Sequence, residues 1–157
     1  MEIEFKSYSK EETIELGKLI SQFVFRGSVL TLTGDLGAGK TTFTGGVAKG
    51  LEIEEKVSSP TFNIMKCYFK GKISLYHIDA YRLEEGTNKV LGLEEFIEGD
   101  GVCLIEWPNF IEELIDNKMA LNIEIHHVDL NTRSFKIVTE NKKYSGLFDA
   151  IKERYHD

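Results

Sequence analysis

Apolar and polar positions along the chain follow two different periods. In residues 10–25, apolar side chains recur every three or four positions, which predicts an amphipathic helix. Ser9 is followed three positions after it by Glu12, a spacing typical of a capping box at a helix start. Residues 2–7 alternate and predict a short strand, and residues 28–33 are rich in apolar and β-branched side chains. We therefore expect residues 28–33 to form a strand buried in a central sheet.

The rest of the chain predicts further strands and helices. Residues 61–70 and 72–80 flank Gly71 closely and predict a β-hairpin. Helical spacing or start signals predict helices over residues 40–49, 88–99, 108–115 and 145–155. Apolar or alternating runs predict strands over residues 101–107, 120–128 and 133–140, and we expect the last two strands to pair. Strands first alternate with helices and later come in pairs. This order predicts an α/β layered fold, with a parallel core and antiparallel additions to one mixed sheet.

Composition places limits on this picture. A chain of 157 residues, 41% hydrophobic and 29% charged, fits one globular domain over residues 1–157. No apolar run reaches the roughly 20 residues that span a bilayer, and the acidic start is unlike a signal peptide. Cys67 and Cys103 lack CxxC spacing, so we expect buried, reduced thiols and a cytoplasmic protein. The net charge of −7 disfavours independent nucleic-acid binding, which usually needs a basic patch.

One segment carries a specific chemical signal. Residues 34–41 match G-x-x-x-x-G-K-[ST], between a predicted strand and a predicted helix. Glycine permits backbone dihedrals that turn successive N–H groups inward around phosphate oxygens, and the helix start adds its positive dipole end. Lys40 would reach the β- and γ-phosphates, the Thr41 hydroxyl would ligate Mg²⁺, and Thr42 could meet the α-phosphate. The match predicts a nucleotide-binding P-loop and a three-layer α/β/α, P-loop NTPase-like fold.

Two acids at predicted strand ends are candidates to act with the metal. Glu106 follows four apolar residues, and Asp79 ends the second hairpin strand. The carboxyl ends of strands are where α/β sheets place ligands. We assign Glu106 to the metal and expect Asp79 to act through a metal-bound or attacking water. Because the chain lacks the Asn-Lys-x-Asp stretch with which GTPases read guanine, the sequence favours ATP.

Four segments together resemble the bacterial TsaE family, also called YjeE or YdiB: "GDLGAGKTTF", "SSPTF", "YHIDAYRL" and "LIEWP". The resemblance implies that ATP and Mg²⁺ are bound by the loop residues Gly37, Ala38, Gly39, Lys40, Thr41 and Thr42. It also implies that Thr61 contacts the nucleotide near the γ-phosphate and that Asp79 is needed for activity. Glu106 would correspond to the magnesium-associated acid, with Trp107 beside the site. We therefore name Asp79, Glu106 and Lys40 as candidate catalytic residues, and Thr41 and Glu106 as candidate metal ligands.

The resemblance also implies a pathway. The family is the ATPase component of tRNA threonylcarbamoyladenosine synthesis, which modifies an adenosine in tRNAs that read codons beginning with adenine. Its members work with two protein partners, TsaD and TsaB. By this resemblance the chain would touch tRNA only indirectly, through TsaD-like and TsaB-like proteins, and its acidic charge agrees with that. We expect slow ATP hydrolysis by the chain alone and faster hydrolysis with the partners.

Other interpretations remain open at the level of sequence. A small-molecule kinase could be this short, although residues 84–100 offer many acids and only Lys89 as a base for a lid over the phosphates. A nucleotide-dependent interaction module without turnover is the other alternative. Arg82 could pair with Asp79 or stabilise phosphate charge. His77 is expected to be a packed or hydrogen-bonded strand residue rather than a catalytic base.

Overall fold

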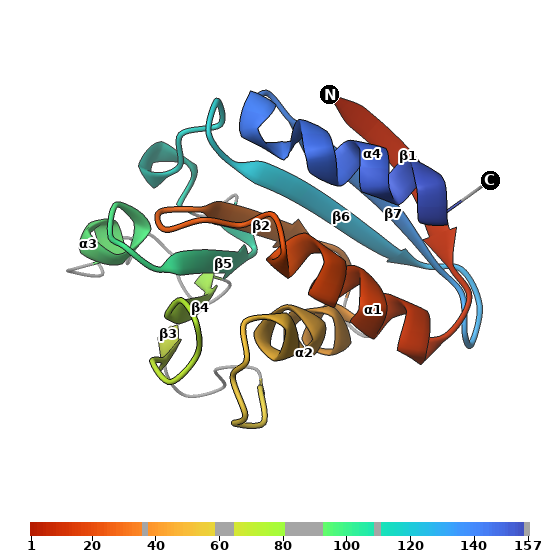
Figure 1. The fold of residues 1–157 in the computed structure, drawn as a ribbon, viewed down its shortest axis with the longest axis horizontal. Coiled ribbons are helices and arrows are strands. Elements are labelled where there is room, and N and C mark those ends of the chain that lie inside the picture. The colour runs from red at the N-terminus through yellow and green to blue at the C-terminus, as the bar shows by residue number, and fades with distance from the viewer. Residues whose placement is uncertain (36–37, 59–64, 81–92, 109–110, 156–157) are drawn as a thin grey trace.

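The computed structural model describes residues 1–35, 38–58, 65–80, 93–108 and 111–155 (Figure 1). The predicted site residues Gly37, Thr61 and Arg82 lie outside these ranges. The strands are β1 (Glu2–Ser7), β2 (Val29–Thr33), β3 (Met65–Tyr68), β4 (Leu75–Asp79), β5 (Val102–Glu106), β6 (Leu121–His127) and β7 (Arg133–Thr139). The α-helices are α1 (Lys10–Ser21), α2 (Lys40–Gly50), α3 (Leu93–Ile97) and α4 (Ser145–Arg154), and short 3₁₀ helices are η3 (Glu112–Leu114) and η4 (Lys142–Tyr144).

All seven strands form one mixed sheet in the order β1-β7-β6-β2-β5-β4-β3. The central four strands run parallel, because β2 pairs in parallel with β5 and β6, and β4 pairs in parallel with β5. Antiparallel pairs complete both sides, β3 with β4 on one side and β6 with β7 and β7 with β1 on the other. The predicted fold class, with a parallel core plus antiparallel strands, is confirmed.

Helices cover both faces of the sheet. Figure 1 shows α1, α2 and α4 together on one side of the strands, and their buried side chains join those of β2, β6 and β7 in the larger core cluster. Leu16, Phe43 and Phe148 are members of that cluster from the three helices. The smaller cluster lies on the other face, where Leu93 and Ile97 of α3 pack with side chains of β4 and β5. These are the three layers that the sequence predicts.

Glycines let α1 and α2 pack with their backbones in contact. A Cβ on Gly17 would lie 2.6 Å from the Phe43 carbonyl oxygen, and one on Gly46 would lie 2.3 Å from the Ile14 carbonyl oxygen. Neither distance leaves room for a side chain. This contact fixes α2 against α1, and with it the first turn of α2, which follows the predicted P-loop.

The first helix differs from its prediction at the C-terminal end. Its start is as expected, since the Glu12 amide donates to the Ser9 hydroxyl oxygen at 3.1 Å, and Glu12 accepts from the Tyr8 amide. The helix ends at Ser21 rather than continuing to residue 25. Residues 23–25 are all bulky and apolar and are packed against the core. Three consecutive side chains cannot share one helix face, so leaving the helix allows all three to reach the core.

Two other predicted helices are shorter in the described part of the chain. Of the helix predicted over residues 88–99, the structure describes Leu93–Ile97 as helical, and residues 88–92 lie outside it. Over residues 108–115 it describes the 3₁₀ turn Glu112–Leu114, preceded by a bond from the Ile111 amide to the Pro108 carbonyl oxygen at 3.0 Å. The hairpin β3–β4 and the pair β6–β7 are confirmed. Within the described residues, every helix is too short or too polar to cross a bilayer.

Two adjacent glycines of α2 provide a matched test of the α1–α2 contact. We expect Gly46→Ala to lower the free energy of unfolding by roughly 1–3 kcal/mol, because the added methyl group overlaps the α1 backbone. Gly45→Ala meets no atom within 4 Å and should raise the free energy of unfolding by about 0.5–1 kcal/mol through helix propensity. Urea denaturation of both variants measures the difference. Equal effects would show that the close approach of the helices has no role in stability.

Candidate functional site

The predicted site residues in the described part of the chain gather at one edge of the sheet. Because β2, β4 and β5 run parallel, their carboxyl ends lie at the same edge. β2 ends there at Thr33 and α2 begins there at Lys40, while Glu106 ends β5 and Asp79 ends β4. Asp79 and Glu106 are partners in the β4–β5 register. This edge of a parallel sheet is where α/β proteins place ligands.

Two glycines of the loop occupy positions that other residues would strain. Gly34 has φ 153°, and a Cβ on it would lie 2.2 Å from the carbonyl oxygen of Ile125 in β6. Gly39 has φ 103° and precedes α2 in a left-handed conformation. These dihedrals belong to the region that L side chains rarely adopt. The chain can therefore bend tightly between β2 and α2 and still lie against β6.

The start of α2 carries an uncompensated positive potential. Gly39, at the N-cap, supplies no side-chain acceptor, and the first turn of α2 contains no acid. Backbone N–H groups in a first helical turn have no partner within the helix. Thr41 is exposed and Thr42 half-buried at this turn. Together with the dipole of the helix, these groups fit an anion.

Lys40 adds a cation at the same point. Its side chain is buried, and its ammonium group donates to the Gly34 carbonyl oxygen at 2.7 Å. Nζ also lies 4.4 Å from the centroid of the Trp107 ring, a cation–π distance. Trp107 has φ 57°, which breaks the alternation of β5 directly after Glu106. The ammonium group is thus held by a carbonyl and a ring face, both of which an anionic ligand could replace.

The two acids differ in their surroundings. Glu106 is only 4% exposed, and its Oε2 lies 2.5 Å from Nε2 of His77, which is itself fully buried. Alternation along β4 places His77 and Asp79 on the same sheet face as Glu106, the face that α2 covers. Asp79 is half-buried.

These acids do not form a metal centre by themselves. Among the described residues, no group of three or more His, Cys, Asp or Glu side chains is arranged to hold a metal ion. Mg²⁺ commonly binds through one or two protein oxygens together with substrate phosphates and waters. The oxygen donors Thr41 and Glu106 fit such a shared site better than an all-protein one.

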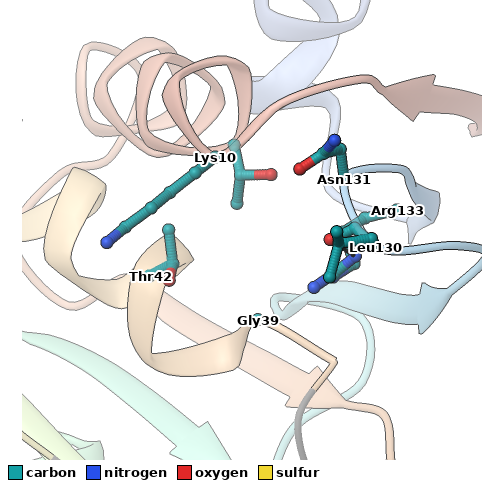
Figure 2. Close-up of a pocket in the computed structure, with 7 residues that line it drawn as sticks. Lys10, Gly39, Thr42, Leu130, Asn131 and Arg133 are labelled. Carbon is teal, nitrogen blue, oxygen red and sulfur yellow. Dashed lines mark hydrogen bonds between the residues drawn. The ribbon is translucent and has the colours of Figure 1, made fainter.

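A cavity of about 450 Å³ opens beside the first turn of α2 (Figure 2). Figure 2 shows side chains from three elements around it, with Lys10 extending from α1 toward α2. The lining residues are Lys10 and Thr13 of α1, Gly39 and Thr42 at the start of α2, Leu130 and Asn131 of the β6–β7 connection, and Arg133 at the start of β7. A second, more open groove of about 820 Å³ shares Lys10 and Thr42 and continues along residues 52–57. The cavity is large enough for part of a small organic ligand.

The β6–β7 turn holds a cation at this cavity. The Asp129 carboxylate accepts from the amides of Asn131 at 3.0 Å and Thr132 at 2.8 Å, and these bonds lower the pKa of Asp129. Arg133 Nη1 donates to the carbonyl oxygens of Asp129 at 2.8 Å and Thr132 at 3.1 Å. The Arg133 Nε atom would be 3.4 Å from a Cβ on Gly39. The turn thus brings a guanidinium group next to the P-loop.

The cysteines lie away from this edge and have no sign of chemical function. Both are free thiols, and Cys103 is buried, as the sequence predicts. The prediction of burial is wrong for Cys67, which is half-buried because it lies on the edge strand β3. Cys103 Sγ donates to the Phe96 carbonyl oxygen at 3.0 Å, and burial raises the pKa of this thiol to about 12. A thiol with so high a pKa is a poor nucleophile.

The structure adds residues that the sequence analysis missed. It places Ala38, Gly39, Lys40, Thr41 and Thr42 in one turn, whereas Gly37 and Thr61 lie outside the described residues. His77 is a buried, hydrogen-bonded strand residue, as the sequence predicts, but the sequence did not identify Glu106 as its partner. Arg133 carries no local signal, because its place depends on β6 pairing with β2.

Comparison with known proteins identifies proteins that resemble this chain in sequence and in structure. The family described as "Threonylcarbamoyl adenosine biosynthesis protein TsaE" matches residues 7–135. The tRNA threonylcarbamoyladenosine biosynthesis protein TsaE of Bacillus subtilis is 42% identical over 150 residues, covering 96% of this chain and 94% of the relative. The TsaE protein of Nostoc sp. is 48% identical over 144 residues, covering 88% and 86%. The crystal structure of Bacillus subtilis YdiB matches with a TM-score of 0.79 at 36% identity, covering 98% and 96% of the two chains.

The Asp129 turn gives a pH prediction with a definite sign. A lowered pKa means that the folded turn favours the ionised carboxylate of Asp129. The ionised carboxylate therefore stabilises the fold above the ordinary carboxyl pKa of about 3.9, and this stabilisation is lost as the pH falls through the lowered pKa. In an NMR titration, the amide shifts of Asn131 and Thr132 should follow this low transition. Asp129→Asn, which keeps an oxygen acceptor but does not ionise, should abolish it. A transition at or above the ordinary value would contradict the assigned cause.

Proposed function

Because this chain belongs to the TsaE family of threonylcarbamoyl adenosine biosynthesis proteins, we propose that it binds and hydrolyses Mg-ATP as the ATPase subunit of that pathway. The observation that carries the proposal is the start of α2, where an uncapped helix terminus and the Lys40 ammonium group converge. Both contribute positive charge, and among the described residues neither is seen in contact with an acidic side chain. A polyphosphate supplies the missing negative charge.

The loop residues then have distinct roles toward the phosphates. Amide groups of Gly37, Ala38 and Gly39 donate to phosphate oxygens, and Lys40 exchanges the Gly34 carbonyl and the Trp107 ring for the β- and γ-phosphates. The Thr42 hydroxyl contacts the α-phosphate. Thr61, outside the described residues, is our proposed contact near the γ-phosphate. The exchange at Lys40 is favourable because a phosphate oxygen carries charge that a carbonyl oxygen and a ring face lack.

Magnesium would be held between the protein and the nucleotide. Thr41 offers an exposed hydroxyl, and Glu106 offers a buried carboxylate at the end of β5. When bound, Mg²⁺ neutralises charge on the β- and γ-phosphates. Asp79, one strand away from Glu106, is proposed to orient the attacking water. The absence of an all-protein metal cluster in the described residues agrees with a metal that arrives with ATP.

The base and ribose are proposed to occupy the cavity beside Gly39 and Thr42. Its volume of about 450 Å³ fits a nucleoside, since ligand pockets usually measure about 300–1,000 Å³. Leu130 offers an apolar surface, and Lys10 and Arg133 offer cations near the phosphate end. The lack of a guanine-reading motif supports ATP over GTP.

Partner proteins complete the proposal. The chain would act in the cytoplasm with TsaD-like and TsaB-like proteins and reach tRNA only through them, which its net charge of −7 supports. Slow hydrolysis by the isolated chain is expected, because residues 84–100, the candidate lid, carry many acids and only Lys89 as a base. A partner could supply that charge, as activating proteins do for other P-loop enzymes.

Nucleotide binding can be tested through Lys40. Lys40→Ala should weaken Mg-ATP binding by about 100-fold or more, because it removes a desolvated charge that faces phosphates. Lys49→Ala, at the exposed end of the same helix, is the matched control and should bind normally. Isothermal calorimetry gives the affinities, and emission of Trp107, the single tryptophan, should change when Lys40 leaves its ring. Tight binding by folded Lys40→Ala would contradict the proposed phosphate site.

Hydrolysis and partner dependence are tested by phosphate release. The wild-type chain should release phosphate slowly alone and faster with TsaD-like and TsaB-like proteins. Glu106→Gln and Asp79→Asn should each lower the stimulated rate by about 100-fold, since both remove a carboxylate from the reacting site. Thermal unfolding checks that the variants stay folded. Mg-ATP binding without any phosphate release, with partners present, would favour the interaction module and overturn the ATPase proposal.

A further inference from the structure

His77 is a buried polar side chain that the proposed ATPase mechanism leaves without a role. It lies in the middle of β4 and is fully buried on the face that α2 covers. Its strand neighbours Leu75 and Leu104 are apolar and fully buried. An apolar residue would fill this place without the cost of burying an imidazole. The hydrogen bond between this ring and Glu106 is therefore the feature that needs an explanation.

That contact defines which imidazole nitrogen acts. Nε2 of His77 lies 2.5 Å from Oε2 of Glu106, and both side chains are buried. Because carboxylate oxygens accept hydrogen bonds, we assign the proton of this bond to Nε2, which donates it. Nδ1 is buried and has no hydrogen-bond partner among the described residues. The bond to Glu106 thus accounts for the orientation of the whole ring.

A buried donor of this kind restricts the carboxylate that it contacts. With Oε2 fixed by His77, the Glu106 side chain is confined to one orientation, and Oε1 has one direction in which to act. Hydrogen bonds to metal-associated carboxylates and histidines typically set their orientation, and their loss costs about 10–100-fold in metal affinity or activity. Glu106 directly precedes Trp107, whose ring contacts Lys40. The Glu106 carboxylate therefore lies next in sequence to a residue that contacts the phosphate loop.

We propose that His77 is a positioning residue, which orients the Glu106 carboxylate toward nucleotide-bound magnesium through its Nε2–H donor. The inference rests on the proposed function, because it assumes that Glu106 acts with Mg²⁺. His77 itself touches neither nucleotide nor metal. Its contribution is to keep Glu106 in the metal-competent orientation before the ligand arrives.

Two amide variants separate this role from packing. Gln places its side-chain NH₂ near the position of Nε2, whereas Asn places it near Nδ1, away from Glu106. His77→Gln should therefore behave much as the wild type does. His77→Asn should need about tenfold more Mg²⁺, or more, for half-maximal ATP hydrolysis. Nucleotide affinity in EDTA should be the same in both variants, because the loop and Lys40 are unchanged.

Metal binding is also measured without turnover. Mn²⁺ is titrated into the protein–ADP complex and followed by electron paramagnetic resonance, with emission of Trp107 reporting nucleotide occupancy. We expect the Mn²⁺ affinity to fall about tenfold or more in His77→Asn and to be restored in His77→Gln. If His77→Asn does not fold, His77→Phe, which keeps a ring and removes the donor, replaces it in the same comparison.

Thr31→Val is the control for general destabilisation of the sheet. Thr31 is buried and donates to Asn122 at 2.6 Å on the opposite face, so its loss should lower stability without changing metal dependence. The positioning role is overturned if Thr31→Val changes metal dependence as much as His77→Asn does, or if His77→Asn keeps the metal dependence of the wild type. Either result leaves the proposed ATPase function intact. Normal metal affinity without hydrolysis in His77→Gln would also overturn the positioning role, by assigning His77 a direct step. Failure of the wild type to bind Mg-nucleotide overturns the proposed function, and this inference with it.

Discussion

The close approach of α2 to its neighbours is the constraint on which the site depends. Gly46 brings the α2 backbone against α1, and Gly34 brings the preceding loop against β6. A helix held at this distance presents its first-turn amides and Lys40 directly over the carboxyl ends of the parallel strands. A methyl group at either glycine would move the helix start outward. The electrostatic character of the site is therefore a result of backbone packing as much as of charged residues.

The buried ammonium group of Lys40 is stabilised by two neutral groups of the protein. The Gly34 carbonyl and the Trp107 ring each offer partial negative charge, and together they stabilise the ammonium group without an acid. The buried acid Glu106 is held by His77 instead. Cation and carboxylate thus have separate partners, and the described contacts include no salt bridge between them. Both stay available to a ligand that carries negative charge and a metal.

Sequence reasoning reached the local features and missed those that depend on distant pairing. The phosphate loop, the hairpin β3–β4 and the capped start of α1 are local, and periodicity or a motif identifies each of them. The pairing of β6 with β2 is not local, because the two strands are far apart in the chain. This pairing, together with that of β6 with β7, brings Arg133 to Gly39. The early end of α1 followed from tertiary packing of residues 23–25, which overrides helix propensity. The partner of Glu106 depended on strand order as well.

The pairing of β1 with β7 has a consequence for how the chain acquires its fold. The Met1 amino group donates to the Thr139 carbonyl oxygen, 138 positions away, and β1 finds its only described sheet partner in β7. During synthesis at the ribosome, β1 must wait for its partner until residues 133–139 have emerged. Contacts of such long sequence separation slow folding, because a long loop must close before the pairing stabilises it. The edge of the sheet that β1 forms is therefore completed only after β7 has been made.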